Sequence, residues 1–158
     1  MSAVGHALGR PAGPDEDFYA WSQRQARLLA EGRLDEADIG RIGEEIESLG
    51  RSELRAVASL TLRILQHMIY LRWSPATLPR AHWESELIVW RGQLLDELHD
   101  SPSLKPRLDE LFDAQWRRAR RAASVKLVEF DRMQALPETC PFTMEQVLDE
   151  DYVPQAER

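Results

Sequence analysis

The amino-acid sequence predicts an all-α protein: a mostly antiparallel bundle of four main helices followed by a short C-terminal helical arm. Three observations support this fold class. Apolar residues recur every three or four positions over long segments, no segment alternates in the manner of a strand, and no repeat of about 20 to 50 residues is present. Helical segments joined by short connections favour an antiparallel bundle.

Length and composition limit the classes of protein to consider. The 158 residues fit one domain over 15–154, between a flexible tail at 1–14 and a polar end at 155–158. The net charge of −7 disfavours nucleic acid and anionic membranes as partners. The longest apolar run, 59–71, is too short to cross a bilayer. A single cysteine, Cys140, and the lack of a leader pattern make the cytoplasm the expected compartment.

The first helix is predicted to run from an Asp15 N-cap to about Glu31. Gly32 supplies the left-handed conformation that commonly ends a helix. One side of this helix carries its apolar residues, and we expect that side to pack against the rest of the protein. This side consists of Phe18, Trp21, Gln25, Leu28 and Leu29.

The central helix is predicted to begin after an Asp35 N-cap and to end near Trp73, before two prolines at 75 and 79. Its first part has an apolar stripe that we expect to face a partner helix. The stripe consists of Ile39, Ile42, Ile46 and Leu49. Beyond Gly50 the apolar positions shift around the helix, so two helices or one helix kinked at Gly50 would both fit.

The position of Glu53 distinguishes these two arrangements. In a continuous helix it falls at about 320° from Ile39, within the apolar stripe. An unpaired carboxylate there would be costly to bury. The sequence therefore predicts either a break at Gly50 or a buried partner for Glu53.

Three further helices are predicted. The third covers 80–99, and the fourth runs from a Ser103 cap to about Asp131. A short last helix begins at a capping box formed by Thr143 and Gln146.

Three carboxylates on the central helix, Glu44, Glu45 and Glu47, suggest a metal or acid-base site, because bundle helices can build di-iron sites from such groups. At about 100° per residue from Ile39 they point near 140°, 240° and 80°, so they diverge. Only 96–99 approximates the Glu-x-x-His pair of such sites. We predict no metal and no cofactor, and we interpret the carboxylates as surface groups paired with arginines.

His67 lies at the border between the polar and apolar sides of the central helix. No Ser, Cys or Asp partner can be placed beside it, which favours a hydrogen-bonded structural histidine over a ligand or general base. Cys140 precedes Pro141 in a connector without a basic neighbour or a Cys-x-x-Cys partner. This setting predicts an inert thiol.

The four arginines within 117–121 resemble a nucleic-acid-binding patch. They cover the outward side of the fourth helix, and Asp113 lies one turn before Arg117. With the acidic total charge, a solvated face is favoured, and nucleic acid is not an expected partner.

Several short motifs resemble the bacterial family of unknown function DUF29 over about 15–154. They are DFYAW at 17–21, EEIESLGRSE at 44–53, DSPSL at 100–104, PETCPF at 137–142 and LDED at 148–151. The motif positions that we single out are Asp17, Tyr19, Trp21, Gly50, Ser101, Pro102, Cys140, Pro141 and Asp149. The resemblance implies a compact helical bundle in bacterial cytoplasm, and it implies no activity, cofactor or catalytic residue.

Three functions are compatible with these residues. The first is a non-catalytic binding or protein-interaction module that presents the acidic surface at 44–53 to an unknown protein or to a second copy. The second is an enzyme whose site between helices uses Glu45, Glu53 and His67, with or without a metal. The third is nucleic-acid binding through 117–121. The first is favoured, because no catalytic constellation is present.

Overall fold

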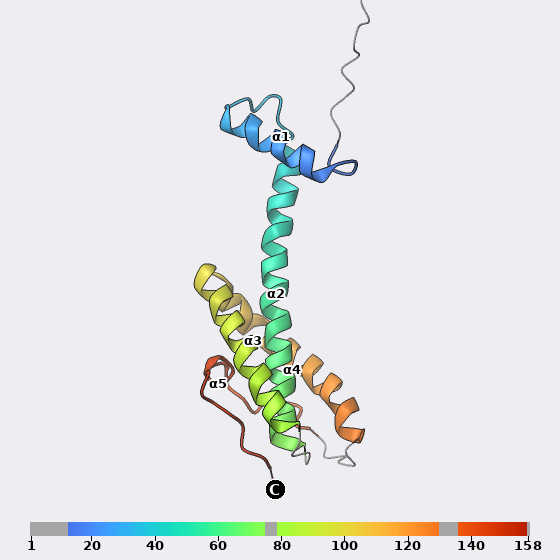
Figure 1. Ribbon diagram of the computed structural model, residues 1–158, viewed down its shortest axis with the longest axis vertical. Coiled ribbons are helices and arrows are strands. Elements are labelled where there is room, and N and C mark those ends of the chain that lie inside the picture. Colours follow the sequence, from blue (N-terminus) through green and yellow to red (C-terminus); the bar gives the residue numbers. More distant parts are fainter. Residues whose placement is uncertain (1–12, 75–78, 130–135, 158) are drawn as a thin grey trace, which may run out of the picture. The chain divides into compact units, whose positions relative to one another are not determined.

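The computed structural model describes residues 13–74, 79–129 and 136–157, and the regular structure in them is entirely helical (Figure 1). The helices are α1 (Phe18–Ala30), α2 (Ile39–Trp73), α3 (Arg80–Asp100), α4 (Leu104–Glu129) and α5 (Met144–Leu148). The predicted all-α fold, with four main helices and a C-terminal arm, is confirmed. The predictions for tail residues 1–12, for Pro75 and for the fourth helix beyond Glu129 lie outside the described residues.

The chain forms two compact units, the first ending at Leu49 and the second beginning at Gly50. Helix α2 is nevertheless one continuous α-helix through Gly50. A glycine inside a helix costs about 1 kcal/mol relative to alanine, and that is too little to break a helix of this length. The continuous arrangement is therefore the one that occurs. The prediction of a single domain over 15–154 stays a prediction.

Helix α1 begins later than expected, because Asp17 rather than Asp15 is its N-cap. The Asp17 carboxylate accepts a hydrogen bond from the backbone amide of Ala20 at 2.9 Å. Asp15 instead lies in a turn in which the amides of residues 16 and 17 donate to the Gly13 carbonyl. Gly32 has a φ of 71° and ends the helix in the left-handed conformation, as predicted. Of the predicted packing side, Trp21, Gln25 and Leu28 are buried, while Phe18 and Leu29 are exposed.

Helix α2 begins at Ile39, so the prediction of Asp35 as its N-cap was wrong. Residues 33–37 form turns, in which the amide of Glu36 donates to the Arg33 carbonyl at 3.3 Å. The capping oxygen comes from Asp38, whose carboxylate accepts from the backbone amide of Arg41 at 3.1 Å. Three acidic residues within four positions carry a carboxylate that can accept such a hydrogen bond. Because residues 33–37 form turns, the last of the three, Asp38, is the one that lies at the start of the helix.

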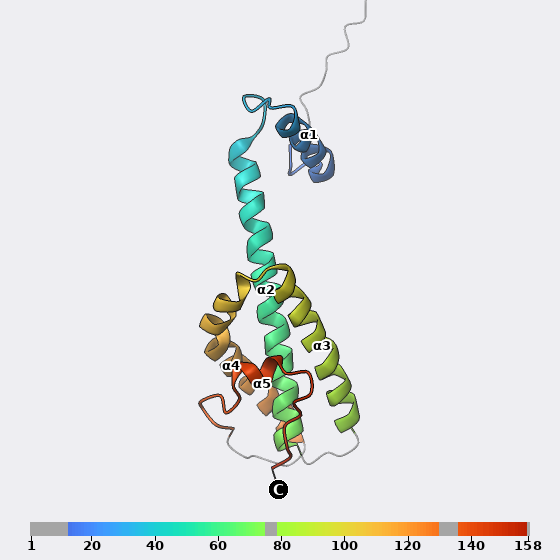
Figure 2. The same cartoon turned by 90° about the vertical axis from the view of Figure 1, so that its left-hand side faces the viewer.

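In the second unit, the later part of α2 packs with α3 and α4, and successive helices run in opposite directions (Figure 2). Apolar side chains from the three helices meet in one core. Its most fully buried members include Val57, Ile64, Leu65, Met68, Ile69, Leu71, Leu87, Leu94, Leu108 and Trp116. Each such aliphatic side chain contributes about 1.5–3 kcal/mol when it leaves water.

The C-terminal arm packs on this core, and α5 lies against α3 (Figure 2). Its first turn has the predicted capping box, in which the Thr143 hydroxyl accepts from the Gln146 amide and the Gln146 side chain accepts from the Thr143 amide. Phe142 and Val147 are both buried in the core, as expected of a hydrophobic staple.

Candidate interaction surface and the other predicted site residues

Arg41 lies close to three carboxylates in the first unit. Its guanidinium lies 3.5 Å from Asp15, 3.1 Å from Glu44 and 3.3 Å from Glu45. The predicted pairing of Glu45 with Arg41 on the same helix is present, and Glu44 pairs with the same guanidinium. One positive charge among three carboxylates leaves this part of the surface anionic even after ion pairing.

The acidic charge of the chain is concentrated in the first unit. Residues 15–49 hold ten acidic and four basic side chains, a net charge of −6 out of −7 for the whole chain. Arg33 is shared in the same way as Arg41, since Glu31 lies 2.8 Å and Glu36 2.6 Å from it. Five carboxylates therefore share two guanidinium groups, and the unit keeps a strong negative potential.

The apolar stripe of Ile39, Ile42, Ile46 and Leu49, here the Ile39–Leu49 stripe, is not covered by a helix of its own unit. Ile39 is 51% exposed, Ile46 64% and Leu49 67%, whereas Ile42 is half-buried. The partner helix expected for the stripe is therefore not supplied by the first unit. Helical periodicity marks a side as apolar, but it does not say what covers that side.

Charged and open positions flank the stripe. At about 100° per residue the stripe occupies an arc of about 80°, with Glu45 on one side and Glu47 on the other. Gly43 lies beside the stripe at about 40°, and a Cβ added there would meet nothing within 4 Å. The first unit thus presents an aliphatic stripe between carboxylates, with room for close approach by another backbone.

Other large apolar side chains of the first unit are exposed as well. Among the described residues, seven of the ten exposed large hydrophobic side chains belong to it. They are Phe18, Tyr19, Leu29, Leu34, Ile39, Ile46 and Leu49. Scattered exposed apolar residues are normal on a protein surface, but this concentration in a short segment is typical of a contact surface.

Glu53 has a partner, although not a buried one. The Ser101 hydroxyl donates a hydrogen bond to Oε2 of Glu53 at 3.1 Å, and the Glu53 side chain remains exposed. The helix is continuous and the carboxylate does not enter the core. Both residues lie in motifs that resemble the family. The two motifs are 48 positions apart in the sequence, and this hydrogen bond brings them into direct contact.

His67 is half-buried, and both of its ring nitrogens face oxygens. Nδ1 lies 3.1 Å from the Arg63 carbonyl, and Nε2 lies 2.8 Å from Oε2 of Glu86. The ring also meets Trp90 edge-on, with centroids 4.5 Å apart. Burial lowers the pKa of His67 below its usual range, against the opposing effects of Arg63 and Glu86. The environment is that of a hydrogen-bonded histidine packed among aromatic rings.

The three residues of the hypothetical enzyme site have different neighbours. Glu45 pairs with Arg41, Glu53 accepts from Ser101, and His67 meets Glu86. Glu53 and His67 are 14 positions apart on one helix, which separates them by about 21 Å along its axis. Among the described residues, no group of three or more His, Cys, Asp or Glu side chains is placed to hold a metal ion.

The arginine-rich segment of α4 is mostly exposed. Arg117, Arg118 and Arg121 are exposed, whereas Arg120 is half-buried. Nε of Arg120 donates to the Leu136 carbonyl at 3.1 Å and so ties α4 to the segment leading into the arm. One of the four arginines therefore has a structural contact instead of a free outward charge.

Cys140 is half-buried beside a small cavity of about 150 Å³. Burial raises the pKa of the Cys140 thiol to about 11, and the nearby Asp113 carboxylate acts in the same direction. The indole of Trp116, which also lines the cavity, donates to the Glu138 carbonyl at 2.9 Å. At neutral pH the sulfur is a thiol, the poorly nucleophilic form.

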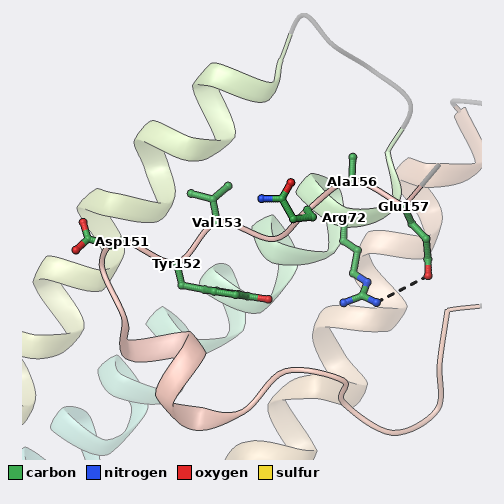
Figure 3. Close-up of a pocket in the computed structure, with 7 residues that line it drawn as sticks. Arg72, Asp151, Tyr152, Val153, Ala156 and Glu157 are labelled. Carbon is green, nitrogen blue, oxygen red and sulfur yellow. Dashed lines mark ion pairs between the residues drawn. The ribbon is translucent and has the colours of Figure 1, made fainter.

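A larger and open pocket of about 590 Å³ lies along the C-terminal segment (Figure 3). Arg72 and Glu157 face each other at one end, with 3.8 Å between their charged groups, and Asp151 lies at the other end. The Arg72 guanidinium also lies 5.2 Å from the centroid of Trp73. Its cation is thus engaged by groups of this chain.

Arg91 is the polar residue that sequence reasoning missed. It is fully buried, and its guanidinium donates to the carbonyls of Gln146, Val147 and Tyr152 at 2.7–2.9 Å. Burial lowers the pKa of Arg91 to about 10, so it keeps its charge at neutral pH. These bonds satisfy carbonyls at the end of α5, which gives Arg91 the role of fixing the arm.

The motif positions have recognisable structural roles in several cases. Asp17 caps α1, Trp21 is buried, Ser101 contacts Glu53, and the Asp149 carboxylate accepts from the Asp151 amide at 3.0 Å. Tyr19 is exposed. Asp17, Ser101 and Asp149 therefore have contacts at helix ends and connections.

One comparison with known proteins gave a match. No helix in the described part of the chain is long and apolar enough to cross a membrane. Neither the curated proteins nor the solved structures gave a match. The model of the family described as domain of unknown function DUF29 matches residues 15–153, which is most of the chain. The chain therefore belongs to the DUF29 family.

Proposed function

We propose that this protein is a non-catalytic protein-interaction module that binds a partner protein through the Ile39–Leu49 stripe. The observation that carries the proposal is the exposure of this stripe in a unit that buries few apolar side chains of its own. Full burial of an aliphatic side chain contributes about 1.5–3 kcal/mol, so covering three or four of them would support a specific complex. We also propose that the protein acts in bacterial cytoplasm.

The contacts of the candidate polar residues support a binding role over an enzymatic one. Glu45, Glu53 and His67 each engage a different neighbour, so in the described part of the chain these three side chains share no common partner. The proposed binding also requires no cofactor, because apolar burial supplies its driving force.

Site-specific photo-crosslinking tests the proposal. A photoreactive phenylalanine analogue replaces Leu49 in the full chain, and Val125 in a control chain, since the two side chains are 67% and 68% exposed. In bacterial extract we expect a discrete product from position 49 that is absent from position 125 and is lost with Ile46→Ser. Mass spectrometry of the product distinguishes another protein from a second copy. Identical products from both positions, unaffected by Ile46→Ser, would contradict the proposal.

A further inference from the structure

We infer that the partner contributes a cationic amphipathic helix, an inference that rests on the proposed function. The stripe itself indicates the shape of the ligand. Its four apolar residues span 11 positions of α2, or about 16 Å, and they lie within a narrow arc. A single helix of about three turns matches that length and width, and it would place its own apolar side in the stripe.

The charges that flank the stripe indicate the sign of the charge that the partner should carry. Glu45 and Glu47 lie on opposite sides of the stripe, and the unit around them has a net charge of −6. A helix docked on the stripe would place its flanking residues near both carboxylates. Lysine or arginine at those positions is complementary, whereas acidic residues would be repelled.

The same charge disfavours a second copy as the occupant. In a two-fold symmetric dimer the same patch meets itself. Two copies of the first unit, each with a net charge of −6, would then be brought together. Nucleic acids and anionic membranes carry the same sign as the patch and would also be repelled. A basic helix of another protein is the occupant that satisfies both the apolar and the charge requirement.

Gly43 favours a helix as the docked element. It lies beside the stripe, and the space around its missing Cβ is open. Two helices approach closely where one of them has a small residue. The side of α2 next to the stripe therefore has room for the backbone of a partner helix.

Designed peptides test the partner class with the full-length protein. Two labelled peptides of about 18 residues have leucine at the same helical spacing as the stripe, with lysine at the remaining positions in one and glutamate in the other. Fluorescence anisotropy measures binding at salt concentrations of about 0.05 M and about 0.3 M. We expect the lysine peptide to bind at least about tenfold more tightly than the glutamate peptide, and to weaken as salt rises.

Matched variants separate the apolar and the charged contributions. Ile46→Ser with Leu49→Ser should weaken the lysine peptide at least about tenfold at both salt concentrations. Glu45→Gln with Glu47→Gln should weaken it at least about threefold at low salt and reduce the salt dependence. Val125→Ser and Asp109→Asn, at exposed positions of α4, should leave binding unchanged. Circular dichroism checks that each variant remains folded.

Each result is decisive for one of the two proposals. Equal binding of both peptides, or no binding of the lysine peptide, overturns the cationic partner class. A second copy crosslinked at position 49 overturns it as well, yet keeps the interaction module. If position 49 gives no crosslinked product that Ile46→Ser abolishes, the proposed function is overturned, whatever the peptides do.

Discussion

The hydroxyl of Ser101 donates a hydrogen bond to Oε2 of Glu53 over 3.1 Å, and so connects α2 to the turn between α3 and α4. Glu53 can occupy the apolar side of a continuous helix because this position is exposed. Glu53 stays at the surface, where water and one hydroxyl satisfy it, so it carries no cost of burial. The contact also joins two segments that are remote in the sequence.

A double-mutant cycle measures this contact. Glu53→Ala and Ser101→Ala should show a coupling energy of about 0.5–1 kcal/mol in urea unfolding, at the lower end for a hydrogen bond because the pair is exposed. Ser103→Ala is the matched control, since Ser103 is exposed two residues further along. A coupling of Glu53 with Ser103 as large as that with Ser101 would contradict the role of the hydrogen bond.

Arg91 should be one of the most sensitive positions in the second unit. Arg91→Met removes the donors to three carbonyls of the arm and leaves them without those partners. We expect a loss of about 3–5 kcal/mol in the free energy of unfolding, and faster proteolysis within 140–157. Arg118→Met, at an exposed arginine of α4, should change stability by less than about 0.5 kcal/mol. Equal effects of the two substitutions would refute the anchoring role.

The elements that the sequence predicted well are specified by neighbouring residues. Thr143 and Gln146 form a capping box across one turn, and Gly32 ends α1 through its own backbone conformation. Such signals act over three or four positions and can be read directly. The starts of α1 and α2 were harder, because several acids in a row could each act as the cap, and the choice depends on turns that use the other residues.

The anchoring of the arm and the exposure of the candidate site depend on contacts that no local pattern specifies. Arg91 bonds to residues 55–61 positions later, and its sequence neighbourhood shows only an arginine on a helix. The exposure of the Ile39–Leu49 stripe is equally non-local, because it depends on where the other helices lie. The concentration of acidic residues within 15–49, in contrast, is visible in the sequence and could have located the charged unit.

His67 should make stability depend on pH in a defined direction. Burial lowers its pKa in the folded state, so the unfolded chain takes up the proton first as pH falls. The stabilisation is complete above the unfolded pKa of about 6.5 and is lost as pH falls towards the folded pKa. In urea unfolding between about pH 5 and 8, the stability difference between wild type and His67→Gln should therefore shrink on the acid side.

The groups that face His67 define the control for this experiment. Glu86 and the Arg63 carbonyl favour the charged ring, while Lys126 disfavours it. His82 also lies near Glu86, at 3.5 Å, but is largely exposed. His82→Gln is the matched control, because it removes an exposed histidine near the same carboxylate. If the advantage of wild type over His67→Gln grew at acid pH, Glu86 would outweigh burial, and the predicted sign would be wrong.

Cys140 should react slowly with thiol reagents in the folded protein. Burial raises its pKa to about 11, so near pH 7.5 it has about 100-fold less thiolate than an ordinary cysteine. We expect slow release of thionitrobenzoate from Ellman's reagent, and fast release once urea unfolds the chain. Asp113→Asn should increase the native rate modestly, because the Asp113 carboxylate disfavours the thiolate. A native rate equal to the unfolded rate would show that the thiol is accessible and ionised, which would contradict its burial beside Asp113 and Trp116.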